Sequence, residues 1–411
     1  MRRIQVKECV QFEKGKPPAQ TNYYGPDAKP YLTPDYLRGE APAELIKPAS
    51  NAVNVADGET IILWDGSNAG EVLKAKFGTL ASTMMRLQHS NQFSSEYFFY
   101  ALKGWEPFLK GQTSGSGIPH VDKEILGNLE VILFDKLEQS QIAKVLSTVD
   151  RAIEQTETLI AKQQRIKTGL MQDLLTRGID EHGNLRSEET HEFKDSPVGR
   201  IPVEWRVASL SYFVPTAEYG ISTSLSDTGL IAVLRMNNLI DGEADIFDLK
   251  YAHYIPSNLL LNEGDVLFNR TNSWEHVGRT GIWRGQIDKA SFASYLVRLN
   301  PHPSRLLSEL LNIWLNWEPT QIAMRRLATP AVQQVNINPT NLRSISAAFP
   351  RDLGEQRRII ERFNSSRNTI RTLQENYRKL ISIKTALMQD LLTGKVRVTP
   401  LLEKDQQEAC A

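Results

Sequence analysis

Apolar residues recur at alternating steps of four and three residues in two long stretches of the chain, 135–176 and 352–393. In the first stretch the repeating positions are Ile142, Leu146, Val149, Ile153, Ile160, Leu170 and Leu174. In the second they are Ile359, Phe363, Ile370, Leu373, Tyr377, Leu380, Leu387 and Leu391. Neither stretch contains proline, so each predicts one long α-helix. The heptad period predicts that the two helices pair as a coiled coil, and packing on separate globules is the alternative.

The two stretches also end in nearly the same sequence. "IKTGLMQDLLT" (166–176) and "IKTALMQDLLT" (383–393) differ only at Gly169 and Ala386, and Glu138-Gln139 recur as Glu355-Gln356. Weaker matches lie upstream: "LASTMMRL" (80–87) aligns with "FASYLVRL" (292–299), and "GETIILWDGSN" (58–68) with "GDVLFNRTNS" (264–273). The spacing between copies grows along the chain, so strand-like blocks are kept while the loops vary. The sequence therefore contains a duplication with the order globule, helix, globule, helix.

This order predicts an α/β protein with two similar globular domains separated by a pair of long helices, which form an antiparallel, pseudo-twofold coiled coil. We expect a first globule at 1–134, a first helix at 135–177, a linker with the second globule at 178–351, a second helix at 352–394 and a tail at 395–411. Loops on a rigid scaffold usually carry binding. Two copies with different loops are therefore expected to bind related but different targets.

Composition narrows the chemistry. The 48 basic and 48 acidic residues balance, so nucleic acid would have to be bound by locally basic faces or with basic partners. The two cysteines, Cys9 and Cys410, lie near opposite ends and favour a reducing cytoplasm. The N-terminus lacks the apolar segment of a secretory signal. No apolar run approaches the roughly 20 residues that cross a bilayer, so no membrane association is expected.

Catalytic motifs are not recognisable in the sequence. It has no Walker loop, no glycine-rich dinucleotide fingerprint and no "PPY" segment, and its seven histidines are scattered without an HxH or HExxH pattern. The chain is therefore expected to be noncatalytic and to bind no cofactor or metal of its own.

Several segments together resemble the DNA-specificity subunit of Type I restriction–modification enzymes. They are the twin "LMQDLLT" helix ends, "GRIPVEW" (199–205), "YGIS" (219–222), "LRMNNLIDGE" (234–243) and "GDVLFNRTNSWEHVGRTGIW" (264–283). The resemblance covers nearly the whole chain and is strongest over 138–176 and 196–393. It implies that each globule is a target recognition domain reading one half of a bipartite site on double-stranded DNA, and that the helices set the spacing.

The same resemblance implies the partners. The helices would dock two methyltransferase subunits, and the assembly can recruit two ATP-dependent restriction subunits. S-adenosylmethionine, and ATP with Mg²⁺, would then bind to those partners. A coiled-coil scaffold with protein-binding globules, or an orphan specificity protein without active partners, are the alternative functions.

Candidate DNA contacts lie in loops rich in hydrogen-bond donors. The segment "NRTNSWEHVGRT" (269–280) follows an apolar strand, and its arginines can bind guanine or phosphate, whereas its asparagines can bind adenine or cap a turn. In the first globule "WDGSNAG" (64–70) takes the place of this loop. The full set of candidates is Asn269, Arg270, Asn272, Arg279, Tyr219, Ser222, Arg235, Asn237, Lys110, Ser114, Ser116, Arg325, Arg326 and Gln333.

The repeated helix ends carry more apolar residues than one seam requires. The candidates for partner binding are Leu170, Met171, Leu174 and Leu175, with their copies Leu387, Met388, Leu391 and Leu392. A second apolar face present twice predicts docking of two copies of one partner. Packing against the adjacent globule is the alternative.

Overall fold

The computed structural model describes residues 1–112, 119–331 and 334–398. The chain divides into two compact units. Unit 1 comprises Met1–Leu159 and the chain from Leu373 onwards, and unit 2 comprises Ile160–Thr372. The long helices α6 (Lys136–Thr176) and α11 (Leu353–Leu392) each contribute to both units. Among the described residues no helix is both long and apolar enough to cross a membrane.

Unit 1 contains two sheets and a β-pair. One sheet has the order β2 (Val10–Lys14), β9 (Met84–His89), β6 (Thr60–Leu63), β7 (Val72–Lys74). The other has the order β4 (Glu44–Ile46), β3 (Lys29–Leu32), β8 (Gly78–Leu80), β5 (Asn54–Val55). Strand β1 (Arg2–Gln5) pairs with β10 (Glu130–Leu133). The short helices are α1 (Val6–Cys9), α2 (Pro34–Arg38), α3 (Ser95–Lys103), α4 (Glu106–Gly111) and α5 (Lys123–Asn128).

Unit 2 repeats this plan with additions. Its larger sheet has the order β14 (Thr216–Tyr219), β23 (Leu296–Asn300), β19 (Val266–Asn269), β21 (Thr280–Ile282), β17 (Gly242–Ala244), β16 (Leu239–Ile240). Its second sheet has the order β18 (Lys250–Ala252), β15 (Ile231–Leu234), β22 (Ala290–Phe292), and β13 (Trp205–Ser209) pairs with β26 (Ser346–Pro350). Helices α7 (Leu210–Phe213), α8 (Ser308–Leu315), α9 (Glu318–Arg325) and α10 (Pro339–Ser344) follow the order seen in unit 1.

Among the described residues, unit 2 adds the hairpin of β11 (Phe193–Lys194) with β12 (Ile201–Pro202) and the β16–β17 pair. Unit 2 also has a sheet of β20 (Thr271–Asn272), β25 (Gln334–Asn336) and β24 (Thr329–Ala331), and the antiparallel bridge between Asp65 and His120 in unit 1 matches its β20–β25 pairing. Unit 2 also contains the 3₁₀ turns η1 (Met236–Asn238) and η2 (Ser257–Leu259).

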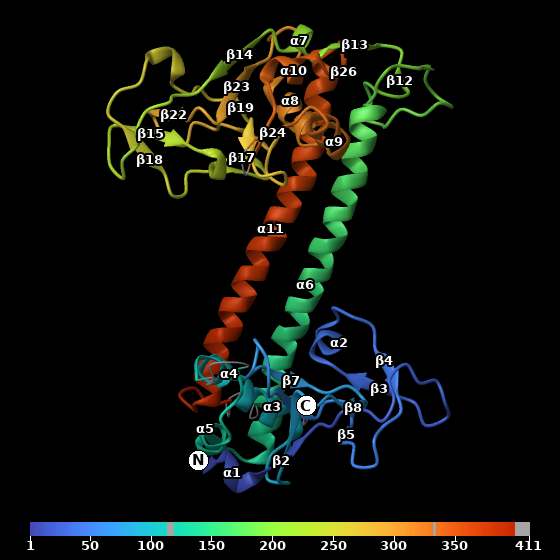
Figure 1. Cartoon of the computed structure of the whole chain (residues 1–411), viewed down its shortest axis with the longest axis vertical. Coiled ribbons are helices and arrows are strands. Elements are labelled where there is room, and N and C mark those ends of the chain that lie inside the picture. The colour runs from blue at the N-terminus through green and yellow to red at the C-terminus, as the bar shows by residue number, and fades with distance from the viewer. Residues whose placement is uncertain (113–118, 332–333, 399–411) are drawn as a thin grey trace, which may run out of the picture. The chain divides into compact units, whose positions relative to one another are not determined.

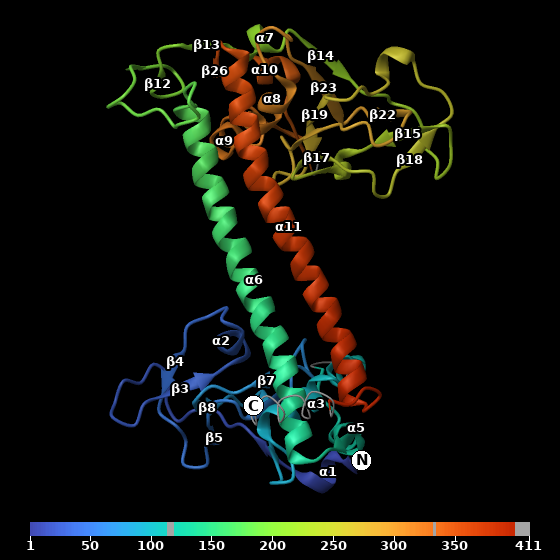
Figure 2. The ribbon, with the colours of Figure 1, turned by 180° about the vertical axis from the view of Figure 1, so that it is seen from behind.

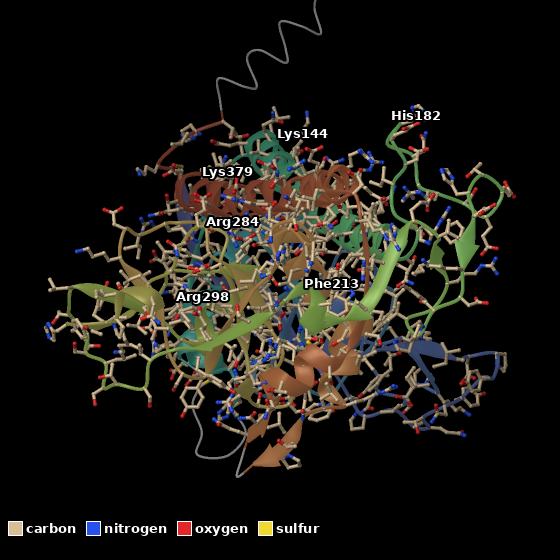
Figure 3. The ribbon with its side chains drawn as sticks, turned by 90° about the horizontal axis from the view of Figure 1, so that it is seen from above. Lys144, His182, Phe213, Arg284, Arg298 and Lys379 are labelled. Atoms are coloured by element: carbon tan, nitrogen blue, oxygen red, sulfur yellow. The ribbon has the colours of Figure 1, made fainter. Side chains whose placement is uncertain are left out.

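Strand register and ion pairs confirm the duplication. Ile61 pairs with Arg86 in unit 1 as Leu267 pairs with Arg298 in unit 2. Arg86 then forms ion pairs with Glu13 at 3.2 Å and Glu59 at 2.8 Å. Arg298, labelled in Figure 3, does the same with Glu218 and with Asp265 at 2.9 Å. An arginine rooted on an inner strand of each sheet is thus neutralised by carboxylates from two neighbouring segments, which fixes the same register twice.

The heptad prediction is confirmed by burial. Every predicted apolar seam position of α6 and α11 is buried or partly buried. The polar residues Thr156, Gln163 and Ser366, which fall at the same heptad positions between them, are partly buried as well. In each unit the segments of the two helices lie side by side in both views (Figures 1 and 2). The helices are antiparallel, because Tyr377 donates to Glu157 at 2.7 Å whereas Lys384 lies 2.6 Å from Asp150.

Asp150 also joins the helices to the globule of unit 1. The Tyr100 hydroxyl donates to Asp150 Oδ2 at 2.7 Å, while Lys384 contacts Oδ1. Burial, together with this hydrogen bond and the negative charge of Asp150, raises the pKa of Tyr100 well above its ordinary range. Helix α3 is therefore linked to α6 and α11 through one carboxylate.

A repeated glutamine anchors each long helix at its start. The side chain of Gln139 accepts from Ser94 N at 2.7 Å and donates to the carbonyls of Gln92 and Phe134 at 2.9 Å. The side chain of Gln356 accepts from Leu307 N at 2.9 Å and donates to the carbonyls of Arg305 and Pro350 at 2.9 and 2.8 Å. Both amides are fully buried. Each one satisfies backbone groups that would otherwise lack partners in the core.

The glutamate before each glutamine is also buried and paired. Glu355 accepts from Arg186, from Trp205 Nε1 at 3.1 Å and from Ile179 N at 3.2 Å. Glu138 pairs with Arg397 at 2.5 Å. The segment after α6 was expected to be a polar linker, but Ile179 and Arg186 are buried in unit 2. The reason is that the buried Glu355 carboxylate needs a cation and hydrogen-bond donors, and this segment supplies them.

Glu355→Gln is expected to lower the free energy of unfolding of unit 2 by about 3–5 kcal/mol, because it leaves the Arg186 charge buried without its partner. The matched control is Glu188→Gln, which removes an exposed pair with Arg200 and is expected to cost less than about 1 kcal/mol. Hydrogen exchange of unit 2 peptides in urea, measured on the full chain, gives both values. Equal effects of the two substitutions would contradict the anchoring role.

Candidate nucleic-acid interface

Arg270 stands where β19 leaves the large sheet of unit 2. Its backbone N donates to Tyr295 O at 3.0 Å, and its carbonyl accepts from Ile337 N at 2.8 Å. Its guanidinium carbon lies 5.0 Å from the centre of the Tyr219 ring. Tyr219 is 49% exposed, and Arg270 forms no ion pair with any residue that the structure describes. A guanidinium stacked on a ring keeps its hydrogen-bond fork available for a guanine edge or a phosphate.

The loop after Arg270 presents two more large side chains to solvent. Trp274 is 53% exposed, and Arg279 is exposed. The base of the loop is fixed by backbone bonds, from Asn269 N to Arg279 O at 2.8 Å and from Gly278 N to Asn269 O at 2.9 Å. Gly278 has a φ of +87°, a left-handed conformation that disfavours residues with a Cβ. A rigid base thus carries an exposed cationic and aromatic tip.

The two asparagines of this loop do not reach outward as Arg279 does. Asn269 is fully buried, and its Nδ2 donates to His276 O at 3.3 Å. This corrects the expectation that Asn269 contacts DNA, because a buried side chain that holds the loop cannot meet a base edge. Asn272 is partly buried, and its Oδ1 accepts from Ser273 N at 2.8 Å. This bond is the turn-capping alternative considered from the sequence.

Most other predicted cations are already paired. Arg235 pairs with Asp248 at 2.9 Å, Arg325 with Glu318 at 3.6 Å, and Lys110 with Glu106 at 3.0 Å. Arg326, Ser222 and Asn237 are exposed. The structure thus brings Tyr219 and Arg270 together, whereas Arg235 belongs to the end of the other sheet. Ser114, Ser116 and Gln333 lie outside the described residues.

Unit 1 has an equivalent position with different side chains. Trp64 N donates to Thr83 O at 2.8 Å, and Val121 N donates to Trp64 O at 3.0 Å. These are the two backbone bonds of Arg270, so Trp64 is its counterpart. Here Lys14, which ends β2 as Tyr219 ends β14, pairs with Asp65 at 2.7 Å. Lys14 was missed from the sequence, although aligning β2 with β14 would have placed it at the position of Tyr219.

Most of the predicted partner-binding residues are covered by their own unit. Leu174 and Leu175 belong to the core of unit 2, and Leu391 to that of unit 1. For these three residues the expectation of a docking surface is corrected, since the adjacent globule buries them. The other five, Leu170, Met171, Leu387, Met388 and Leu392, are partly buried against the same cores.

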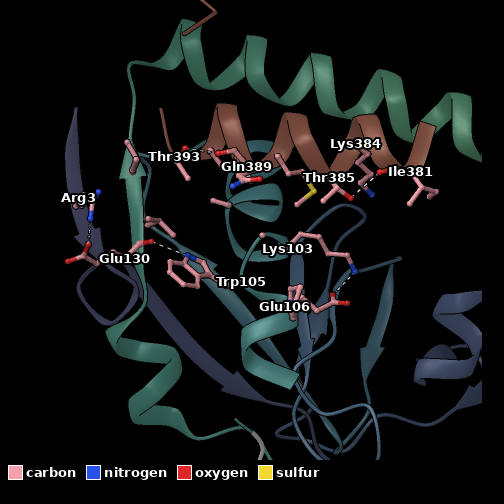
Figure 4. Close-up of a pocket in the computed structure, with 17 residues that line it drawn as sticks. Arg3, Lys103, Trp105, Glu106, Glu130, Ile381, Lys384, Thr385, Gln389 and Thr393 are labelled. Carbon is pink, nitrogen blue, oxygen red and sulfur yellow. Dashed lines mark hydrogen bonds and ion pairs between the residues drawn. The ribbon is translucent and has the colours of Figure 1, made fainter. Parts of the chain in front are cut away.

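Met388 and Leu392 also border an open pocket of about 710 Å³ within unit 1 (Figure 4). Its lining includes Trp105, whose Nε1 donates to Glu130 O at 3.1 Å. The lining also includes two charged pairs, Lys103 with Glu106 at 2.6 Å and Arg3 with Glu130 at 3.1 Å. A mainly apolar depression whose charged groups are paired is the form expected of a surface that receives an apolar side chain.

Comparison with known proteins agrees with this architecture. Residues 2–163 match the family model described as the Type I restriction modification DNA specificity domain. The chain is 31% identical to the Type I restriction enzyme MjaVIII specificity subunit of Methanocaldococcus jannaschii, over 97% of this chain and 93% of that one. It is 26% identical to the putative type I restriction enzyme MjaX specificity subunit of the same organism, over 52% and 51% of the two chains.

Solved structures share the fold. The crystal structure of the Type I restriction–modification system S subunit from M. genitalium superposes with a TM-score of 0.61 at 13% identity, covering 95% of this chain and 96% of that one. A chain from a study of complex assembly and conformational transition of the type I system gives 0.55 at 16% identity, covering 95% and 97%.

The chain belongs to the family of Type I restriction enzyme specificity subunits. The sequence-based resemblance is thereby confirmed. Specificity subunits are noncatalytic, so the expectation that this chain is not itself an enzyme is confirmed by its family.

Asn269→Ala tests the structural role of that side chain. It is expected to cost about 1 kcal/mol and to speed hydrogen exchange across residues 273–279, because the loop loses its bond to the His276 carbonyl. Asn237→Ala, at an exposed position, is the control and is expected to change neither quantity. Unchanged exchange in the Asn269 variant would show that the loop does not depend on this bond.

Proposed function

We propose that this chain is the sequence-reading subunit of a Type I restriction–modification complex, in which each unit reads one half of a bipartite, asymmetric DNA site. The observation that carries the proposal is the equivalent position at the end of the large sheet. The two backbone hydrogen bonds of Arg270 recur at Trp64, so both units support this position in the same way. The side chains nevertheless differ, because unit 2 presents Arg270 with Tyr219 and unit 1 presents Asp65 with Lys14. Two equal supports with different side chains suit two half-sites of different sequence.

Within each half-site, base contacts would determine the sequence that is bound, and phosphate contacts would position the unit on the DNA. Arg270 and Arg279 of unit 2 lie on or beside the loop that would enter a groove and would contact bases, while Asn272 caps a turn of that loop. Lys110, Arg325 and Arg326 lie at or just beyond the ends of α4 and α9 and would hold phosphates. Each mismatched base pair should then weaken binding by about 1–3 kcal/mol.

The long helices set the spacing between the half-sites in this proposal. Support comes from their continuity, since α6 runs for 41 residues and α11 for 40, and each contributes to both units. Their antiparallel seam keeps both helices in one register.

Two methyltransferase subunits dock on the repeated helix segments, and two ATP-dependent restriction subunits can join them. The support is that the two copies leave the same residue open: Ile166 is 46% exposed and Ile383 48%. The pocket beside Met388 and Leu392 supplies an apolar depression in unit 1. S-adenosylmethionine, and ATP with Mg²⁺, bind to the partners rather than to this chain.

Arg270→Ala and Arg279→Ala are each expected to relax sequence preference in one half-site only, because both residues belong to unit 2. Sequencing of methylated bases in a host carrying each variant measures this. Arg200→Ala, which removes an exposed arginine paired with Glu188, is the control and should keep the motif. An unchanged motif in both loop variants would exclude the loop from base reading.

Inserting seven residues after Leu159 and seven after Thr372 keeps the seam in phase. Each helix lengthens by about 10 Å, so the spacer between half-sites is expected to grow by about three base pairs. The same methylation sequencing reads the new spacer. A heptad in α6 alone is the control and should abolish specific methylation, since the paired register is lost. A spacer of the original length in the double insertion would refute the proposal that the helices set the spacing.

A further inference from the structure

We propose that the two units read bases of opposite hydrogen-bond character at the corresponding end of one sheet in each unit. Asp65 of unit 1 accepts a hydrogen bond from the N4 amino group of a cytosine, and Arg270 of unit 2 donates to O6 and N7 of a guanine. The inference rests on the proposed function and adds to it the base that each unit reads. In the strand alignment Asp65 corresponds to Thr271, the residue after Arg270. The Asp65 carboxylate contacts Lys14, as the Arg270 guanidinium contacts Tyr219, and Lys14 and Tyr219 are counterparts. The carboxylate of unit 1 and the guanidinium of unit 2 therefore lie at the same end of the corresponding sheets.

In unit 2 the guanidinium is prepared as a donor. Its Nε is buried and has no hydrogen-bond partner among the described residues, and its central carbon lies over the Tyr219 ring. Arg298, in the same sheet, is consumed by two carboxylates, whereas Arg270 forms no ion pair with any described residue. The two outer amino groups match the adjacent acceptors O6 and N7, which occur together only on guanine in the major groove.

In unit 1 the carboxylate is prepared as an acceptor. Lys14 occupies Oδ2, while Oδ1 has no hydrogen bond from the described residues, and the Asp65 side chain is 30% exposed. Lys14 also offsets the negative charge that would repel phosphates.

A carboxylate can only accept, so it selects a base that presents an amino group in the major groove. Adenine presents N7, an acceptor, beside its amino group and would repel the second carboxylate oxygen, so cytosine fits better.

A purely structural role for the Lys14–Asp65 pair predicts something different. Lys14 is exposed and Asp65 is partly exposed, and ion pairs open to solvent contribute little to stability. Asp65→Ala is therefore expected to fold normally, so a change in base preference would report on reading rather than on folding.

The experiment uses the full chain assembled with its methyltransferase subunits. The bipartite motif is first obtained by selection from random duplexes. Each cytosine of the motif is then replaced in turn by N4-methylcytosine, which blocks the major-groove amino hydrogen. Each guanine is replaced by 7-deazaguanine, which lacks the N7 acceptor. Dissociation constants are measured for the unsubstituted chain, Asp65→Ala, Arg270→Ala and the control Asp35→Ala, another exposed carboxylate of unit 1.

N4-methylation of one cytosine in one half-site is expected to weaken duplex binding roughly 5- to 150-fold for the unsubstituted chain and for Asp35→Ala. The same methylation is expected to leave binding by Asp65→Ala unchanged. One guanine of the other half-site is expected to lose a similar factor on 7-deaza substitution, except with Arg270→Ala. Asp65→Asn, which keeps the size but adds a donor, is expected to move the preference at its position from cytosine towards adenine.

Identical analogue effects in Asp65→Ala and the unsubstituted chain would overturn the assignment of Asp65 while leaving a bipartite motif, and with it the proposed function, intact. Uniform weakening on every duplex would likewise overturn it, because it would mark the pair as a phosphate contact. Both effects falling in the same half-site would also overturn it. Binding without any sequence preference would instead refute the proposed function, and this inference with it.

Discussion

The fold depends on how a buried polar pair attaches each globule to its long helices. A helix start has backbone groups that the helix itself cannot satisfy, and here that start is packed inside a core. Asp135 and Asp352 accept from N–H groups of these helix starts. Gln139 and Gln356 then bond the chain just before each long helix to the chain near the α3 or α8 helix. The neighbouring Glu138 and Glu355 are buried too, and each takes an arginine from beyond the end of the opposite helix. The start of one long helix is thereby tied to the end of the other within each unit.

This attachment leaves the two units free to differ elsewhere. The Arg86 and Arg298 ion-pair sets and the strand registers are the same in both copies. Unit 2 adds the β16–β17 pair, whose Glu243 binds Arg284 at 3.0 Å and also Arg367 of α11. Figure 3 labels Arg284. Charged groups inside the framework therefore serve to specify register, and the surface at the sheet ends is where the copies diverge.

The neutral overall charge is compatible with DNA binding because some cations are paired with carboxylates of the chain and others are not. Arg86, Arg284 and Arg298 each pair with two carboxylates of the chain, so they contribute little positive potential at the surface. Arg270 is stacked on a tyrosine instead, and Arg279 is exposed. In the proposed function, a few cations on a rigid base would give sequence selectivity, while partner subunits would contribute the bulk of the phosphate contacts.

The sequence by itself determined the duplication, the two long helices and the residues of their seam, because heptad spacing and near-identical repeats are local signals that need no knowledge of distant contacts. It also indicated the strand alignment that makes Trp64 the counterpart of Arg270. Only the tertiary structure decided that Asn269 is buried, that Leu174, Leu175 and Leu391 pack into cores, and that Arg186 finds Glu355. Burial and ion pairing depend on which segments far apart in the chain meet, and an apolar face or a charged residue has the same sequence whether its own globule, a partner or water covers it.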